Sequence, residues 1–150
     1  MLRALACAAI GLLAALFLPQ ASAVQAAETE EEARNRALAA GFYEDLWFSN
    51  NTDRYERYLA DTYVVHDIGD RKNVVEPAIE QKHIADMFWS HGDMSGEIVY
   101  QIAEGDLVAT RWIWRYEANT PFGHLLGSGE IPIINVFRFE DGRIVEIWNH

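Results

Sequence analysis

The residues best placed to do chemistry are polar side chains set into apolar rows, and Asn135 is the clearest of them. It alternates in phase with Ile131, Ile133 and Phe137 in a segment of period-two hydrophobicity. Side chains two apart on a strand share one face of a sheet, so Asn135 should point inward with them. A buried amide needs a hydrogen-bond partner, and that partner could be a bound ligand.

A second polar residue, Asp67, alternates with Val65 and Tyr63 and should point inward if its strand is regular. His66 would then point away, because adjacent strand residues face opposite sides. The alternative is that Asp67 ends the strand and bonds loop backbone. Tyr43 lies on an apolar helix face, where a tyrosine can also be a core residue whose hydroxyl is satisfied internally.

Five histidines in an acidic chain raise the question of a metal site, with His66, Asp67, His83 and His91 as possible ligands. No HxH or HExxH signature is present. His83 and His91 are eight residues apart, near two helical turns, yet Gly92 indicates that the helix has ended by then. We therefore expect no metal and no other cofactor.

A nucleophilic triad also lacks support in the sequence. The chain has one cysteine, Cys7, and no Gly-x-Ser-x-Gly motif. Gly127-Ser128-Gly129 falls in a predicted loop with no helix after it, whereas a nucleophile elbow needs a strand before it and a helix behind it.

The elements that must position these residues begin with three predicted helices. Apolar residues at helical spacing predict a helix over 30–47, a shorter one over 53–60, and a third that starts at Pro77. A strand over 63–67 and a loop over 68–75 separate the second helix from the third. The buried stripe of the third helix is predicted to comprise Ile79, His83, Ile84, Met87 and Phe88.

From Ser95 onward the period changes to two, which predicts strands over 97–103, 107–118, 131–140 and 143–149. Asp141-Gly142 is a strong hairpin signal. In the 107–118 strand the tryptophans fall opposite Arg111 and Arg115, so the tryptophan side should face inward. Helices followed by a meander predict an α+β fold, a curved antiparallel sheet with helices on one face.

The first 23 residues are typical of a secretory signal: Arg3, an apolar run over 4–18, and small residues before Ala23. The run is shorter than the roughly 20 residues that span a bilayer. We expect cleavage after Ala23, or alternatively Ala26, and export to the periplasm or the medium. A tether over 24–29 and one domain over 30–150 would remain, without Cys7 and hence without disulfides.

The chain is strongly acidic, with 12 basic and 23 acidic residues and a net charge of −11. Nucleic acid and, after signal cleavage, anionic membrane surfaces are therefore poor partners. The same charge can simply keep an exported protein soluble.

Four segments, read in order, resemble the SnoaL-like polyketide cyclases, within the nuclear-transport-factor-2-like superfamily that also holds the ketosteroid isomerases. The segments are 42–47 (FYEDLW), 59–67 (LADTYVVHD), 102–106 (IAEGD) and 136–148 (VFRFEDGRIVEIW). The resemblance implies a cone-shaped sheet closed by the three N-terminal helices, with a pocket at its wide end. It also implies a homodimer formed through the open sheet face.

By position, the resemblance to the isomerases implies that Asp67 is a base and that Tyr43 holds an oxyanion. Asn135 stands where those enzymes have a protonated aspartic acid. An amide N–H can also donate to an enolate oxygen, and it needs no raised pKa to do so. The rest of the pocket lining is predicted to comprise His66, Trp112, Trp114, Phe137, Trp148 and His150, although the tryptophans could instead fill the core.

The cyclases rely on an acidic residue on or just after the last strand, often within His-Trp-Asp. Ile147-Trp148-Asn149 stand there in this sequence, so that carboxylate has no evident counterpart, although an inward-facing His150 could supply a base. Two functions therefore stay open. One is an isomerase, cyclase or aldol-type enzyme that moves a proton next to a carbonyl. The other is a non-catalytic domain that binds a small apolar or carbonyl-containing molecule or supports a dimer.

Overall fold

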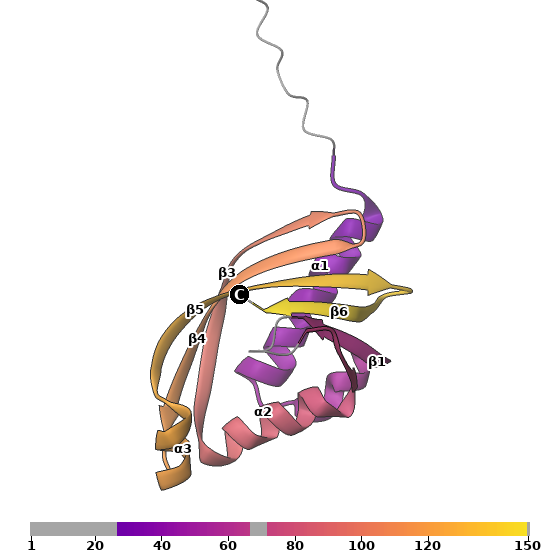
Figure 1. Cartoon of the computed structure of the whole chain (residues 1–150). Coiled ribbons are helices and arrows are strands. Elements are labelled where there is room, and N and C mark those ends of the chain that lie inside the picture. Colours follow the sequence, from indigo (N-terminus) through magenta and orange to yellow (C-terminus); the bar gives the residue numbers. More distant parts are fainter. Residues whose placement is uncertain (1–26, 67–71, 150) are drawn as a thin grey trace, which may run out of the picture.

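The helical elements come first along the chain, as the periodicity predicts. The computed structural model describes residues 27–66 and 72–149 (Figure 1). Helix α1 (Glu30–Tyr43) begins at a capping box, in which Thr29 Oγ1 accepts from the Glu32 amide and the Glu32 carboxylate accepts from the Thr29 amide. It continues as a π-helical turn, η1 (Glu44–Phe48), and a 3₁₀ helix, η2 (Thr52–Arg57), follows.

Within the described residues, six strands form one sheet in the order β2-β1-β6-β5-β4-β3. The predicted α+β class, the meander from β3 to β6 and the hairpin at Asp141-Gly142 are confirmed. All neighbouring strands are antiparallel except β1 and β6, which run parallel and were not predicted to pair. The bounds are β1 (Leu59–His66), β2 (Val74–Pro77), β3 (Gly92–Glu104), β4 (Leu107–Ala118), β5 (Gly129–Glu140) and β6 (Arg143–Asn149).

Strand β2 departs from the prediction, because it begins within the expected loop and ends at Pro77. The prediction that Pro77 starts a helix is therefore wrong. Pro77 has no N–H for a ladder, and it is tolerated because β2 is the edge strand of the sheet. Helix α2 starts two residues later (Ile79–His91). A short helix, α3 (Pro121–Leu126), replaces part of the predicted loop after β4 and is capped by Thr120.

The buried face of α2 also differs from the predicted stripe. His83 is exposed and pairs with Glu80, whereas Ala85 is completely buried. Phe88 packs against the core as expected. The helix is thus rotated so that a small residue, Ala85, lies at its most buried position.

The core lies between the helices and the inner face of the sheet. Figure 1 shows the long strands β3, β4 and β5 bent around α1 and α2. In β4 every second residue from Val108 to Tyr116 is buried, and Arg111 and Arg115 lie on the other face. The inward side of the tryptophans is therefore as predicted. Across residues 27–66 and 72–149, no helix combines the length and apolar character needed to cross a bilayer.

Candidate functional site

A cavity of about 460 Å³ lies between the inner face of β4 and β5 and the helices α1, η1 and α2. Its walls are largely aromatic and aliphatic, as is usual for pockets that hold small molecules. Polar side chains enter at only a few points. The lining residues are Phe42, Tyr43, Trp47, Gln81, Phe88, Trp112, Trp114, Ile131, Pro132, Ile133, Asn135, Phe137, Ile147 and Asn149.

Tyr43 reaches the cavity from the last turn of α1. Only 1% of it is exposed, and its ring packs against Trp112 and Phe137 at centroid distances of 4.7 and 5.6 Å. Its hydroxyl donates to Asn135 Oδ1 over 2.8 Å. Burial raises the pKa of Tyr43 well above its usual value, so the hydroxyl stays protonated and can act as a donor.

Asn135 lies on the inner face of β5 and joins three other side chains. Its Oδ1 accepts from Trp112 Nε1 over 2.7 Å as well as from Tyr43. Its Nδ2 donates to Asn149 Oδ1 over 2.7 Å. We call Tyr43, Trp112, Asn135 and Asn149 the Asn135 network, and all four of its members line the cavity.

Asn149 is a member of this network that sequence reasoning missed. Counting back from the turn at Asp141-Gly142, where Glu140 pairs with Arg143, places Asn135 opposite Trp148. A register shift between Arg138 and Phe139 moves the pairing by one residue, so that Asn149 stands opposite Asn135. A bulge of this kind turns the following side chains to the other face of the sheet. No residue type in the hairpin signals it in advance.

The same shift accounts for the position of Trp148, which does not line the cavity. Its ring stacks on His66 with centroids 4.3 Å apart and planes 6° from parallel. His66 Nε2 lies 2.6 Å from Glu146 Oε2, and its Nδ1 lies 2.7 Å from Asn73 Oδ1. His66 and Trp148 therefore form an outer-face pair, separate from the Asn135 network.

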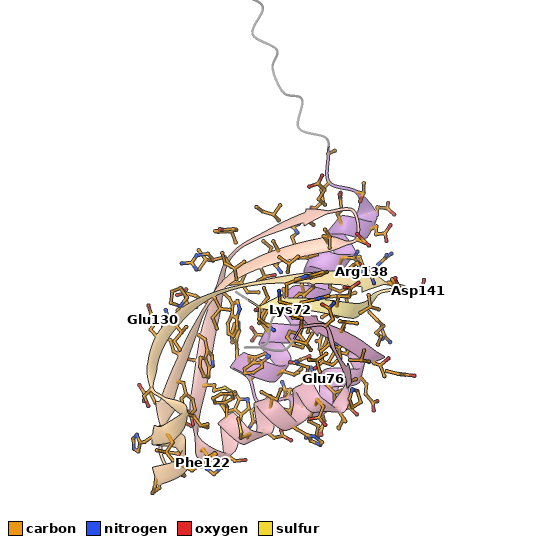
Figure 2. All side chains as sticks on the ribbon, viewed as in Figure 1. Lys72, Glu76, Phe122, Glu130, Arg138 and Asp141 are labelled. Atoms are coloured by element: carbon orange, nitrogen blue, oxygen red, sulfur yellow. The ribbon has the colours of Figure 1, made fainter. Side chains whose placement is uncertain are left out.

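Glu146, the partner of His66, is held in its charged form. Burial acts to raise its pKa, but hydrogen bonds from His66 and Arg138 outweigh that effect and lower the pKa. Arg138 Nε donates to Glu146 Oε1 over 2.5 Å. Figure 2 shows Arg138 and Asp141 together at the β5–β6 hairpin, far from Phe122 on α3.

The predicted site residues thus fall into three groups. Five surround the cavity: Tyr43, Asn135, Trp112, Trp114 and Phe137. His66 and Trp148 lie on the outer face. Asp67 and His150 are outside the described residues, as is the predicted signal segment.

The histidines considered as metal ligands lie apart where they are described. His66 is on β1, whereas His83, which is exposed, and His91, which is half-buried, are on α2. His91 Nδ1 lies 3.0 Å from Thr120 Oγ1. Within 27–66 and 72–149, no three His, Cys, Asp or Glu side chains gather closely enough to hold a metal ion.

The described lining contains amide, hydroxyl and indole groups but no carboxylate and no histidine. These side chains can bury an apolar molecule and hydrogen-bond an oxygen on it. A base for proton transfer would have to come from outside this set.

Comparison with known families agrees with this architecture. The family described as SnoaL-like polyketide cyclase matches residues 37–150. None of the curated proteins matches the chain.

Solved structures share the fold at low sequence identity. A proposed polyketide cyclase from Acidithiobacillus ferrooxidans is 21% identical, with 78% of this chain and 87% of that one covered and a TM-score of 0.62. Wild-type IdmH, a proposed polyketide cyclase from Streptomyces antibioticus, is 24% identical, with coverages of 77% and 90% and a TM-score of 0.63. An LEH-like epoxide hydrolase from M. tuberculosis is 16% identical, with coverages of 79% and 83% and a TM-score of 0.63. Identity this low shows the fold alone.

Proposed function

Because the chain belongs to the SnoaL-like polyketide cyclase family, we propose that its cavity binds a small, largely apolar molecule that carries a carbonyl or similar oxygen. One observation carries the proposal: an apolar, largely aromatic cavity of about 460 Å³ contains a compact polar network centred on Asn135. Apolar walls supply the burial energy of a ligand, and a few fixed polar groups orient it.

The aromatic walls favour a planar or ring-containing skeleton. Trp47 contacts both Trp112 and Phe88, with ring centroids 6.2 Å apart in each case. Rings packed in this way present edges and faces to a guest at little cost in conformational entropy. The polar network lies along one part of the wall, so a ligand with a single oxygen would bind in one orientation.

The test is a thermal-shift screen of the purified protein against small cyclic ketones, repeated with Asn135→Leu. Ligands that bind the folded state raise its stability, by about 2.7 kcal/mol at one hundred times Kd. We expect ketones to stabilise the parent protein and to lose most of that effect in Asn135→Leu. Thr52→Val, which alters a buried polar residue outside the cavity, is the control. Ketones that stabilise Asn135→Leu as strongly as the parent protein would contradict the proposal.

A second candidate function, proton transfer next to the ligand carbonyl, is favoured by the state of Tyr43. Its buried hydroxyl stays neutral, and by turning away from Asn135 Oδ1 it could donate to a developing enolate oxygen, together with an N–H of Asn135. Asp67 is the base that the sequence resemblance suggests. Incubating a bound ketone with the protein in D₂O and following loss of its α-proton signals by NMR tests this function directly. Binding without exchange would leave the domain a non-catalytic binder.

We further propose that the protein is exported, on the strength of the charged, apolar and small-residue regions within residues 1–23. Intact-mass analysis of the protein from its host should show an N-terminus at Val24. A mass that retains residue 1 would contradict export by this signal.

A homodimer through the outer face of the sheet is a separate proposal. It is supported by exposed apolar side chains there, with Tyr100 50% and Ile134 37% exposed. Light scattering of the parent protein and of Tyr100→Glu would test it. A monomeric parent protein at high micromolar concentration would contradict it.

A further inference from the structure

The amide of Asn135 has an oxygen end and a nitrogen end, and its neighbours decide which way it points. A tyrosine hydroxyl can donate or accept, so Tyr43 would tolerate either end. An indole N–H can only donate. Because Trp112 Nε1 lies 2.7 Å from this group, the end that faces it must be the oxygen. Trp112 alone therefore fixes the direction of the amide.

The direction of the Asn135 amide also determines the direction of the Asn149 amide. With both lone pairs of Asn135 Oδ1 engaged by Tyr43 and Trp112, the nitrogen end must face Asn149. Asn149 then turns its own oxygen to Asn135 Nδ2, 2.7 Å away. The Asn135 amide can therefore offer a ligand only the second hydrogen of Nδ2, which is a hydrogen-bond donor.

We propose that the indole N–H of Trp112 sets the cavity to select ligands that accept hydrogen bonds over ligands that donate them. This inference rests on the proposed function, and it narrows the ligand class to molecules whose polar atom is a carbonyl-type acceptor. Trp112 acts through Asn135, so it is a positioning residue for the Nδ2 donor that hydrogen-bonds the ligand.

Trp89 on α2 provides a matched control, because its indole N–H also makes a hydrogen bond within the protein. Its Nε1 donates to the backbone carbonyl of Leu46 over 2.8 Å, and the residue is not part of the cavity wall. Replacing either indole by phenylalanine removes one such hydrogen bond. Only Trp112→Phe removes the donor that fixes the Asn135 amide, and only that variant lets Asn135 reverse.

The experiment uses two pairs of planar probes, each matched in skeleton. 1-Indanone and 9-fluorenone only accept, whereas indole and carbazole offer a donor N–H at a comparable position. Dissociation constants for the parent protein, Trp112→Phe and Trp89→Phe are measured by isothermal titration calorimetry. The readout is the affinity ratio of acceptor to donor probe within each protein, in which any loss of ring area cancels because it affects both probes.

We expect the parent protein and Trp89→Phe to favour the acceptor probes by about tenfold or more, the effect of leaving one buried donor unpaired. In Trp112→Phe that ratio should fall about tenfold. An equal fall in both variants, or no fall in either, would overturn the inference while leaving ketone binding, and hence the proposed function, intact. Failure of every probe to bind the parent protein would instead overturn the proposed function, and this inference with it.

The parent protein alone keeps the inference testable if Trp112→Phe does not fold. Equal affinity of the parent protein for acceptor and donor probes, with ketones still bound, would overturn the inference.

Discussion

The hydroxyl of Tyr43 donates to the side-chain oxygen Oδ1 of Asn135 over 2.8 Å. This hydrogen bond connects α1 to β5, and its two residues are 92 positions apart in the sequence. Both residues are almost completely buried. The bond therefore both stabilises the fold and holds the polar part of the cavity in place.

Tyr43→Phe should lower the free energy of unfolding by about 1–1.5 kcal/mol, the usual net contribution of a buried neutral hydrogen bond. Urea denaturation measures the change. Tyr116→Phe is the matched control, because the Tyr116 hydroxyl is buried but has no partner within the described part of the chain. If Tyr116→Phe costs as much as Tyr43→Phe, the loss does not come from the bond to Asn135.

Asp67→Asn should abolish α-proton exchange of a bound ketone and leave the melting temperature nearly unchanged. The reason is that an amide cannot accept the proton that a carboxylate accepts. Exchange is followed by NMR in D₂O and the melting temperature by circular dichroism. A large loss of stability, with no exchange in the parent protein to lose, would mean that Asp67 is structural.

Glu146 should make the fold sensitive to acid. Its pKa is lowered in the folded protein, so its charged form stabilises the fold above the ordinary value near 4.5, and that contribution disappears as pH falls through the lowered pKa. The stability difference between the parent protein and Glu146→Gln should therefore shrink as the pH falls below about 4.5 and through the lowered pKa. Chemical denaturation at a series of pH values measures it.

The control for Glu146 is Glu97→Gln, which removes the partner of Arg115 at a more exposed site. Exposed ion pairs contribute little to stability, so its difference from the parent protein should change less with pH. An equal change in both variants would point to overall charge instead of the hydrogen bonds of Glu146.

Gly123→Ala should displace α3 from its packing site. A Cβ at this position would collide with the backbone carbonyl of His91 and lie 3.0 Å from the Tyr116 hydroxyl. Overpacking of this kind costs about 1–3 kcal/mol, and faster hydrogen exchange in 121–126 should accompany it.

Gly105→Ala is the contrasting substitution, since nothing lies within 4 Å of its Cβ position and only its φ of +59° opposes a side chain. It should cost about 1 kcal/mol and leave α3 unaffected. Unchanged exchange of α3 in Gly123→Ala would show that this helix can shift without loss.

The sequence alone was sufficient to predict the features that depend on the alternation of apolar and polar residues within one segment. The row of Ile131, Ile133, Asn135 and Phe137 lines the cavity, and the tryptophans of β4 face inward, because each of these strands is regular there. The turn residues Asp141-Gly142 likewise placed the β5–β6 hairpin.

Features that depend on how two segments meet were harder to predict. The register shift in the last hairpin exchanges Trp148 for Asn149 on the inner face, and no pattern within either strand marks it. The parallel pairing of β1 with β6 joins residues more than 80 positions apart, which no local pattern encodes. Asn135 was therefore predictable as an inward polar residue, whereas its partner on β6 was not.

The place of β6 has a consequence for biosynthesis. Because β6 lies between β1 and β5, a nascent chain that lacks residues 143–149 holds two half-sheets with no strand to bridge them. Contacts so distant in sequence form slowly and late. The hydrophobic interior can therefore close only once residues 143–149 have been synthesised, which makes the folding of the whole sheet a late event.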